Sequence, residues 1–184
     1  MLRDWKLVLC LLFLPGAACV WGGEDADLEL KVKATFLASF AQFVEWPDAA
    51  MGAADAPIIV GVLGDDPFGT YLEQAASRKT ANGRKIQVKR FQDAAAAAAG
   101  SHILFVGNSE RQHLVKVFQE LKTKPVLTVA DMPNFLKDGG MIRFVIRDER
   151  VQLEINAEKA KSNELRISSK LLRLASIVEV PERR

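Results

Sequence analysis

Residues 57–77 read PIIVGVLGDDPFGTYLEQAAS, a stretch in which an apolar run, a polar turn and a helix-forming segment follow one another. The run Ile58–Leu63 is short and rich in β-branched side chains, which predicts a buried strand. Asp66 followed by Pro67 is typical of a helix start, with aspartate as the N-cap, and predicts a helix to about Ser77. A buried strand that leads directly into a helix is the repeating unit of a parallel α/β sheet.

The same alternation continues downstream and sets the fold class. Further strands are predicted at 85–91, 102–106 and 126–129, where apolar residues alternate with polar ones or form short runs. Two more helices are predicted, one over the alanine tract 94–99 and one from Ser109 to about Lys122. Asp93 caps the first of these helices, a Ser109–Gln112 capping box opens the second, and Asn82-Gly83 forms a turn.

The C-terminal part does not continue the alternation of strand and helix. Residues 141–146 and 151–155 are two strand-like runs separated by RDER at 147–150, which predicts an antiparallel hairpin, and helical segments including 168–175 follow. The expected architecture is α/β: a single three-layer domain over residues 28–178. Its mainly parallel sheet has about six strands, with a C-terminal antiparallel hairpin and helices on both faces.

The first 22 residues have the composition of a secretory leader. A short basic start precedes the apolar run LVLCLLFL at 7–14, and small residues follow it. A core of this length is too short for a membrane anchor, so residues 1–22 are predicted to be a signal peptide that directs the chain to the periplasm. Cleavage after Ala18 would leave Cys19 free for lipid attachment, which is the less favoured alternative.

An aromatic segment, FLASFAQFVEWP at 36–47, stands out in the first predicted helix, residues 28–46. Its three phenylalanines share the apolar face of the helix, opposite a polar face, so they are predicted to dock the helix against the sheet. Pro47 is predicted to end the helix. Trp46 falls beside the polar face and is therefore a candidate for contact with a ligand or partner.

Composition argues against several classes of function. The formal net charge is only +2, and basic residues are scattered, so nucleic acid is not an expected partner. From Gly23 onward there is no cysteine, and the two histidines, His102 and His113, have no metal-binding spacing. No catalytic constellation is visible, so neither enzymatic activity nor a cofactor or metal is expected.

One loop is a candidate ligand site. The segment Gly64–Gly69 is predicted to follow a parallel strand and precede a helix, where backbone N–H groups converge in open sheets. Asp65, Asp66 and Phe68 are its candidate contacts, although a tight structural turn is the favoured interpretation. Gly139-Gly140 is likewise interpreted as a structural turn.

Several segments together resemble one family of secreted proteins, the YfiR family. The resemblance rests on the order and spacing of motifs over about residues 28–178, and it covers nearly the whole chain after the leader. These motifs are Lys33-Ala34, Phe36-Leu37, Phe40, Phe43–Pro47, Gly61–Gly64, His102–Val106, Leu127–Asp131, Gly139–Ile142, Glu154–Asn156 and Ser168–Ala175.

The resemblance implies a non-enzymatic periplasmic repressor. The best-known members bind the periplasmic region of a membrane-bound diguanylate cyclase, an OmpA-like outer-membrane lipoprotein antagonises them, and they can dimerise. Cyclic-di-GMP output and biofilm formation are held down as a result. Redox control through disulfides, known in some members, does not extend to a chain without cysteine after Gly23. The alternative hypothesis is a periplasmic small-molecule-binding module that uses the Gly64–Gly69 loop and a groove near Trp46.

Overall fold

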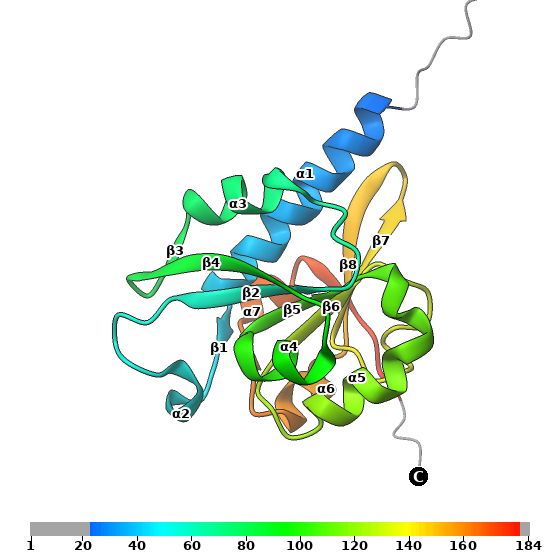
Figure 1. The fold of residues 1–184 in the computed structure, drawn as a ribbon. Helices are drawn as coiled ribbons and strands as arrows, with labels where there is room; N and C mark the ends of the chain where they lie inside the picture. Colours follow the sequence, from blue (N-terminus) through cyan, green and yellow to red (C-terminus); the bar gives the residue numbers. More distant parts are fainter. Residues whose placement is uncertain (1–22, 181–184) are drawn as a thin grey trace, which may run out of the picture.

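The computed structural model describes residues 23–180 (Figure 1). The α-helices are α1 (Gly23–Ser39), α2 (Asp48–Met51), α3 (Thr70–Ser77), α4 (Ala94–Gly100), α5 (Leu114–Leu121), α6 (Ala157–Ser162) and α7 (Ser169–Leu172), with 3-10 helices η1 (Phe40–Gln42) and η2 (Asn108–His113). The strands are β1 (Val44–Glu45), β2 (Ile58–Leu63), β3 (Thr80–Ala81), β4 (Arg84–Phe91), β5 (Ile103–Val106), β6 (Leu127–Ala130), β7 (Ile142–Arg147), β8 (Arg150–Ile155), β9 (Arg166–Ile167) and β10 (Ala175–Ile177).

The main sheet has eight strands in the order β10-β8-β7-β6-β5-β2-β4-β3. The five central neighbours β4, β2, β5, β6 and β7 are parallel, and β7 and β8 form the predicted antiparallel hairpin. The expected α/β architecture is confirmed. The two strands beyond the expected six are the short edge strands β3 and β10, and β10 begins at Ala175, inside a predicted helix.

Helices cover both faces of the sheet, which gives the expected three layers (Figure 1). On one face, α1 and α3 bury a large core that includes Leu37, Phe40 and Leu72 against the strands. On the other face, α4 and α5 bury a second core that includes Ala97 and Val117. Parallel strands that are covered on both sides read as continuous apolar runs, and every residue of β2, β5 and β6 is buried.

The first helix ends earlier than predicted. Helix α1 stops at Ser39, the chain tightens into η1, and Val44 and Glu45 then pair antiparallel with Ile167 and Arg166. The prediction that residues 28–46 are one helix was therefore wrong beyond its first three turns. A long-range strand pairing replaced the local helical pattern, so the orientation deduced for Trp46 from a helical wheel does not apply.

Two predicted helix starts were also wrong. Asp66 does not cap a helix, because its side chain accepts a hydrogen bond from the Phe68 amide two residues on, and α3 begins only at Thr70. Ser109 opens no capping box, because its hydroxyl accepts from the Asp65 amide and the chain forms η2 before α5. Both side chains instead accept hydrogen bonds from backbone amides of the loop that follows β2 at the carboxyl edge of the sheet.

Other local predictions are confirmed. Asp93 caps α4 by accepting from the Ala96 amide, and Asn82-Gly83 forms the two-residue turn between β3 and β4 with positive φ at both residues. Among residues 23–180, no helix combines the length and the apolar character that a membrane crossing requires. The predicted leader, residues 1–22, lies outside the described residues.

Candidate functional site

Trp46 lies at the amino edge of the sheet and is half-buried. Its indole nitrogen donates to the His102 carbonyl at 3.2 Å, and the two rings meet edge to face. His102 in turn accepts a hydrogen bond from the Ile59 amide through Nδ1 at 3.0 Å. The tryptophan is thus held by structural contacts, and only part of its ring is open to a partner.

The Gly64–Gly69 loop lies at the opposite, carboxyl edge. Asp65 is exposed, whereas Asp66 pairs with Arg90 at 2.6 Å and Phe68 is buried with its ring 4.7 Å from that of Phe105. Arg90 also pairs with Glu73, so it fixes the loop to α3. In this conformation Phe68 belongs to the core, and Asp65 is the most accessible of the three candidate contacts.

The structure does not bring the sequence-predicted candidates together. Trp46 contacts the start of β5 beside Ile59, while the loop follows Leu63, so about 13 Å of strand β2 separates them. A single small-molecule site that uses both the loop and a groove near Trp46 is therefore not assembled in this conformation.

A charged cluster that the sequence pattern did not reveal lies near the carboxyl edge. Lys33 of α1 is only 5% exposed, and it pairs with Glu29 at 2.6 Å and with Asp131, just after β6, at 2.9 Å. Burial alone would lower the pKa of Lys33, but the two carboxylates together raise it. The spacing of Glu29 and Lys33, four residues apart on a helix, was the only local signal for this pairing.

An apolar groove runs between α1 and α7. It has a volume of about 410 Å³ and is lined by Phe36 of α1, by Phe40 and Phe43 in and just after η1, and by Leu171 and Leu174 in and just after α7. Phe40 is fully buried and stacks on Phe144, but Phe36 and Phe43 are only partly buried and Leu174 is 67% exposed. The predicted core stripe therefore serves two purposes, since one phenylalanine packs inside and two form the floor of a groove.

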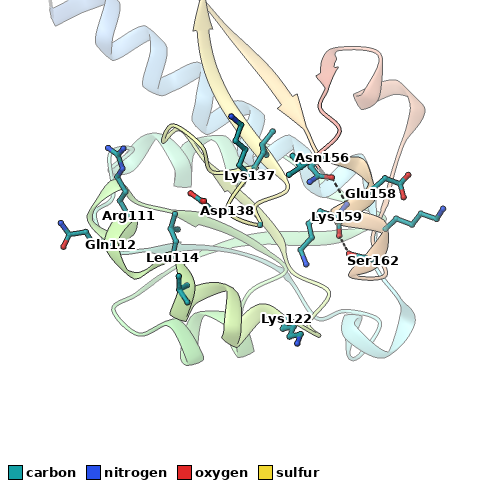
Figure 2. Close-up of a pocket in the computed structure, with 15 residues that line it drawn as sticks. Arg111, Gln112, Leu114, Lys122, Lys137, Asp138, Asn156, Glu158, Lys159 and Ser162 are labelled. Carbon is teal, nitrogen blue, oxygen red and sulfur yellow. Dashed lines mark hydrogen bonds between the residues drawn. The ribbon is translucent and has the colours of Figure 1, made fainter. Parts of the chain in front are cut away.

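A second, larger cavity of about 970 Å³ lies between α5 and α6 (Figure 2). Figure 2 shows Arg111 and Leu114 on one wall and Asn156 and Lys159 on the other. Five basic side chains line this cavity, against two carboxylates: Arg111, Lys122, Lys137, Lys159 and Lys161, with Asp138 and Glu158. No sequence motif marked this place, because its walls come from four separate segments, 111–122, 136–139, 156–162 and Val180.

The histidines take no metal-binding arrangement. Within residues 23–180, no group of three or more His, Cys, Asp or Glu side chains has a geometry suited to a metal ion. Burial lowers the pKa of His102, so this ring is neutral near pH 7 and acts as the acceptor for the Ile59 amide. His113 lies on the exposed η2 beside Glu110.

Solved structures share the fold. An ABC domain from Streptococcus pneumoniae in complex with L-Trp superposes with a TM-score of 0.52 at 12% identity, over 79% of this chain and 62% of that chain. A conserved domain protein from Vibrio cholerae gives a TM-score of 0.54 at 10% identity, over 82% of this chain and 60% of that chain. At these identities the likeness concerns the fold alone, and this chain spans about three fifths of either relative's length.

The sequence itself has one clear family match. The profile of the YfiR/HmsC-like family matches residues 30–176, from early in α1 to within β10. A sequence comparison with curated proteins finds no significant match.

Proposed function

This chain belongs to the YfiR/HmsC-like family, and we propose from this that it is a periplasmic regulator that binds the periplasmic region of a membrane sensor. The sensor that the family suggests is a membrane-bound diguanylate cyclase, which the bound regulator would hold in a low-activity state. In this role the protein binds rather than catalyses, in keeping with the family's regulatory character.

The observation that carries the proposal is the apolar groove between α1 and α7. Apolar side chains that gather in a concave site with a polar border are a common place for a partner to bind. Here Phe36 and Phe43 form a half-buried floor and Leu174 stands exposed on the rim. Lys31 and Thr35 are its polar border. An apolar floor with a polar rim is the usual anatomy of a protein–protein interface.

The groove suits apolar anchor side chains from a partner. Its volume of about 410 Å³ holds a few large side chains, as when an amphipathic helix lays its apolar face into a hydrophobic groove. Burial of such anchors contributes roughly 25 cal/mol for each Å² of apolar surface removed from water. A sensor segment that binds here would contact α1 and α7 at once, so its binding would require both helices to be folded and in place.

Finer parts of the proposal come from the family and, for the leader, from the sequence of residues 1–22. An OmpA-like outer-membrane lipoprotein would act as the antagonist that removes the regulator from the sensor, and the regulator would be able to form a homodimer. The leader would be residues 1–22, followed by one domain over residues 28–178, and secretion to the periplasm would follow. Lipid attachment at Cys19 is the alternative to simple secretion, and fractionation of a Cys19→Ser variant distinguishes the two.

The decisive experiment combines deletion and complementation in the source bacterium. Deletion of the gene is expected to raise the cellular concentration of cyclic-di-GMP, and the wild-type gene is expected to lower this concentration again. The variant Leu174→Glu places a charge on the rim of the groove and should fail to lower it. In vitro, this variant should bind the purified periplasmic region of the cyclase about tenfold or more weakly, as for loss of an interface anchor.

A matched control uses another exposed apolar residue. Ile146 is 48% exposed on β7 and lines neither the groove nor the cavity between α5 and α6, so Ile146→Glu should bind and complement like the wild type. Both variants should keep a melting temperature close to that of the wild type, because both side chains are exposed. Unchanged cyclic-di-GMP after deletion would refute the cyclase role, and equal effects of the two variants would refute the groove.

A further inference from the structure

The cavity between α5 and α6 is distinct from the groove, and its lining carries an excess of basic side chains. The whole protein has a formal net charge of only +2, yet five of the cavity's lining residues are basic and two are acidic. We propose that this cavity binds an amphipathic organic oxyanion, with the anionic group at Lys159 and Asn156 and the apolar portion on Leu114, Leu136 and Val180.

The basic side chains of the cavity are not engaged by carboxylates of the described chain. None of the five forms a salt bridge with another residue in 23–180, whereas Lys33 and Arg90, for example, are each held by two carboxylates. An unpaired cation at the wall of a cavity keeps its full attraction for an incoming anion, because no internal carboxylate has to be displaced first.

Asn156 supplies a second, independent observation. It lines the cavity and is only 6% exposed. Its side-chain oxygen accepts from the Lys159 amide at 3.0 Å, which caps α6, whereas its amide nitrogen has no hydrogen-bond partner in the described part of the chain. This nitrogen is therefore free to donate to a ligand in the cavity. An oxyanion beside Lys159 would accept this hydrogen bond.

The direction of the side chains supports the same place for the anion. Figure 2 shows Lys159 extending from α6 into the space between α6 and the wall that carries Leu114, while Glu158 turns away from it. Lys122 and Lys137 lie at opposite ends of the cavity in the same view. Long basic side chains at the rim can swing toward a bound anion at little cost, since each is exposed.

The apolar lining sets the rest of the ligand class. Leu114 and Leu136 are buried, Val180 is half-buried, and all three line the cavity. A small inorganic ion would leave this lining in contact with water, whereas a ligand with a short acyl or other apolar portion would cover it. The volume of about 970 Å³ admits such a ligand. It could come from a soluble metabolite or from an anionic membrane lipid.

The test titrates the isotope-labelled protein, residues 23–184, with short-chain dihexanoyl phosphatidylglycerol and follows amide chemical shifts. We expect saturable shifts at residues 156–162 and 111–115, weakened strongly in about 0.5 M salt because charge attraction is screened. Inorganic phosphate, which has no apolar portion, and dihexanoyl phosphatidylcholine, which has no net charge, should bind more weakly. Equal binding of all three probes, or no shift at these residues, would overturn the proposal.

Charge variants separate a site from a general basic surface. The double variant Lys159→Gln/Lys161→Gln should weaken phosphatidylglycerol binding by about tenfold, on the order of threefold for each charge. The matched double variant Lys116→Gln/Lys170→Gln removes two exposed lysines outside the cavity and should leave binding unchanged. Glu158→Gln removes a nearby negative charge and should tighten binding, an effect that a purely structural role would not produce.

A last pair of measurements distinguishes the two sources of ligand. If the protein also cosediments with phosphatidylglycerol vesicles, and the Lys159→Gln/Lys161→Gln variant does not, the ligand is a membrane headgroup. If only the monomeric short-chain lipid binds, the ligand is a soluble amphipathic anion. Identical binding by the two double lysine variants in every format would overturn the site.

Discussion

The helices on the two faces of the sheet pack by different means. On the face covered by α1 and α3, large aromatic side chains such as Phe40 and Phe144 fill the space between helix and sheet. On the other face, α4 is built from alanines and packs through small side chains such as Ala97, while the segment after β6 contributes a large one, Phe135. Large side chains leave open apolar surface where a neighbour covers them only in part, as at Phe36 in the groove.

The largest expected effect comes from removing a ring on the aromatic face. Phe40→Ala should lower the free energy of unfolding by about 3–5 kcal/mol, since a fully buried aromatic side chain leaves a cavity. Urea denaturation of the purified variant measures this change. Near-wild-type stability would show that this face can collapse around the gap, and the comparison between the two faces would fail.

The second effect comes from adding an atom on the other face. A Cβ at Gly140 would overlap the ring of Phe135, which is fully buried beside Met132 and Leu136. Gly140→Ala should therefore cost about 1–3 kcal/mol through overpacking. The same substitution in a Phe135→Ala background should cost less, because the overlapping ring atoms are then gone. Additive effects in this double-mutant cycle would argue against a steric cause.

A smaller effect distinguishes Phe36 of α1 from Phe40 of η1. Phe36 is only partly buried on the floor of the groove, so Phe36→Ala should cost about 1 kcal/mol of stability. It should nevertheless weaken binding to the sensor region as strongly as Leu174→Glu does. Calorimetric titration beside urea denaturation gives both numbers for one variant. A Phe36→Ala protein that binds normally would leave the groove without its proposed role.

The smallest effect concerns pH at the amino edge, where both faces end. Burial lowers the pKa of His102 below its usual 6.5, and its neutral Nδ1 accepts from the Ile59 amide. The unfolded chain therefore takes up this proton at a higher pH than the folded one, so stability is complete above pH 6.5 and falls as the pH drops through the folded pKa. Urea midpoints measured at neutral pH and at pH 5 should differ more for the wild type than for His102→Gln.

The sequence was sufficient for elements whose signals are local. The Asp93 cap and the Asn82-Gly83 turn formed as predicted because both depend on hydrogen bonds within a few residues. Ser109 shows the limit of such reasoning, because its hydroxyl oxygen accepts a hydrogen bond from the Asp65 amide of another loop instead of capping a helix. The predicted end of the first helix was wrong for the same reason, since a strand from the far end of the chain pairs with residues 44 and 45.

The candidate sites were harder to predict than the fold. The phenylalanine stripe was visible in the sequence, but its partial exposure depends on how far α7 covers α1. The α5–α6 cavity was invisible, because Arg111, Lys137 and Lys159 are distant in sequence and meet only after the sheet has formed. Periodicity reports which side of a helix is apolar, and it does not report how much of that side a neighbour covers.

The small β1–β9 ladder has a consequence for the order of folding. It fastens the segment after α1 to the segment before α7, and the Ser168 amide adds a hydrogen bond to the Phe43 carbonyl. Contacts between such distant parts of a chain close a long loop, which is slow and entropically costly. The groove between α1 and α7 should therefore be among the last features to form, after synthesis of the C-terminal segment is complete. A partner that binds there would bind completely folded chains and would not bind chains whose C-terminal segment has not yet folded.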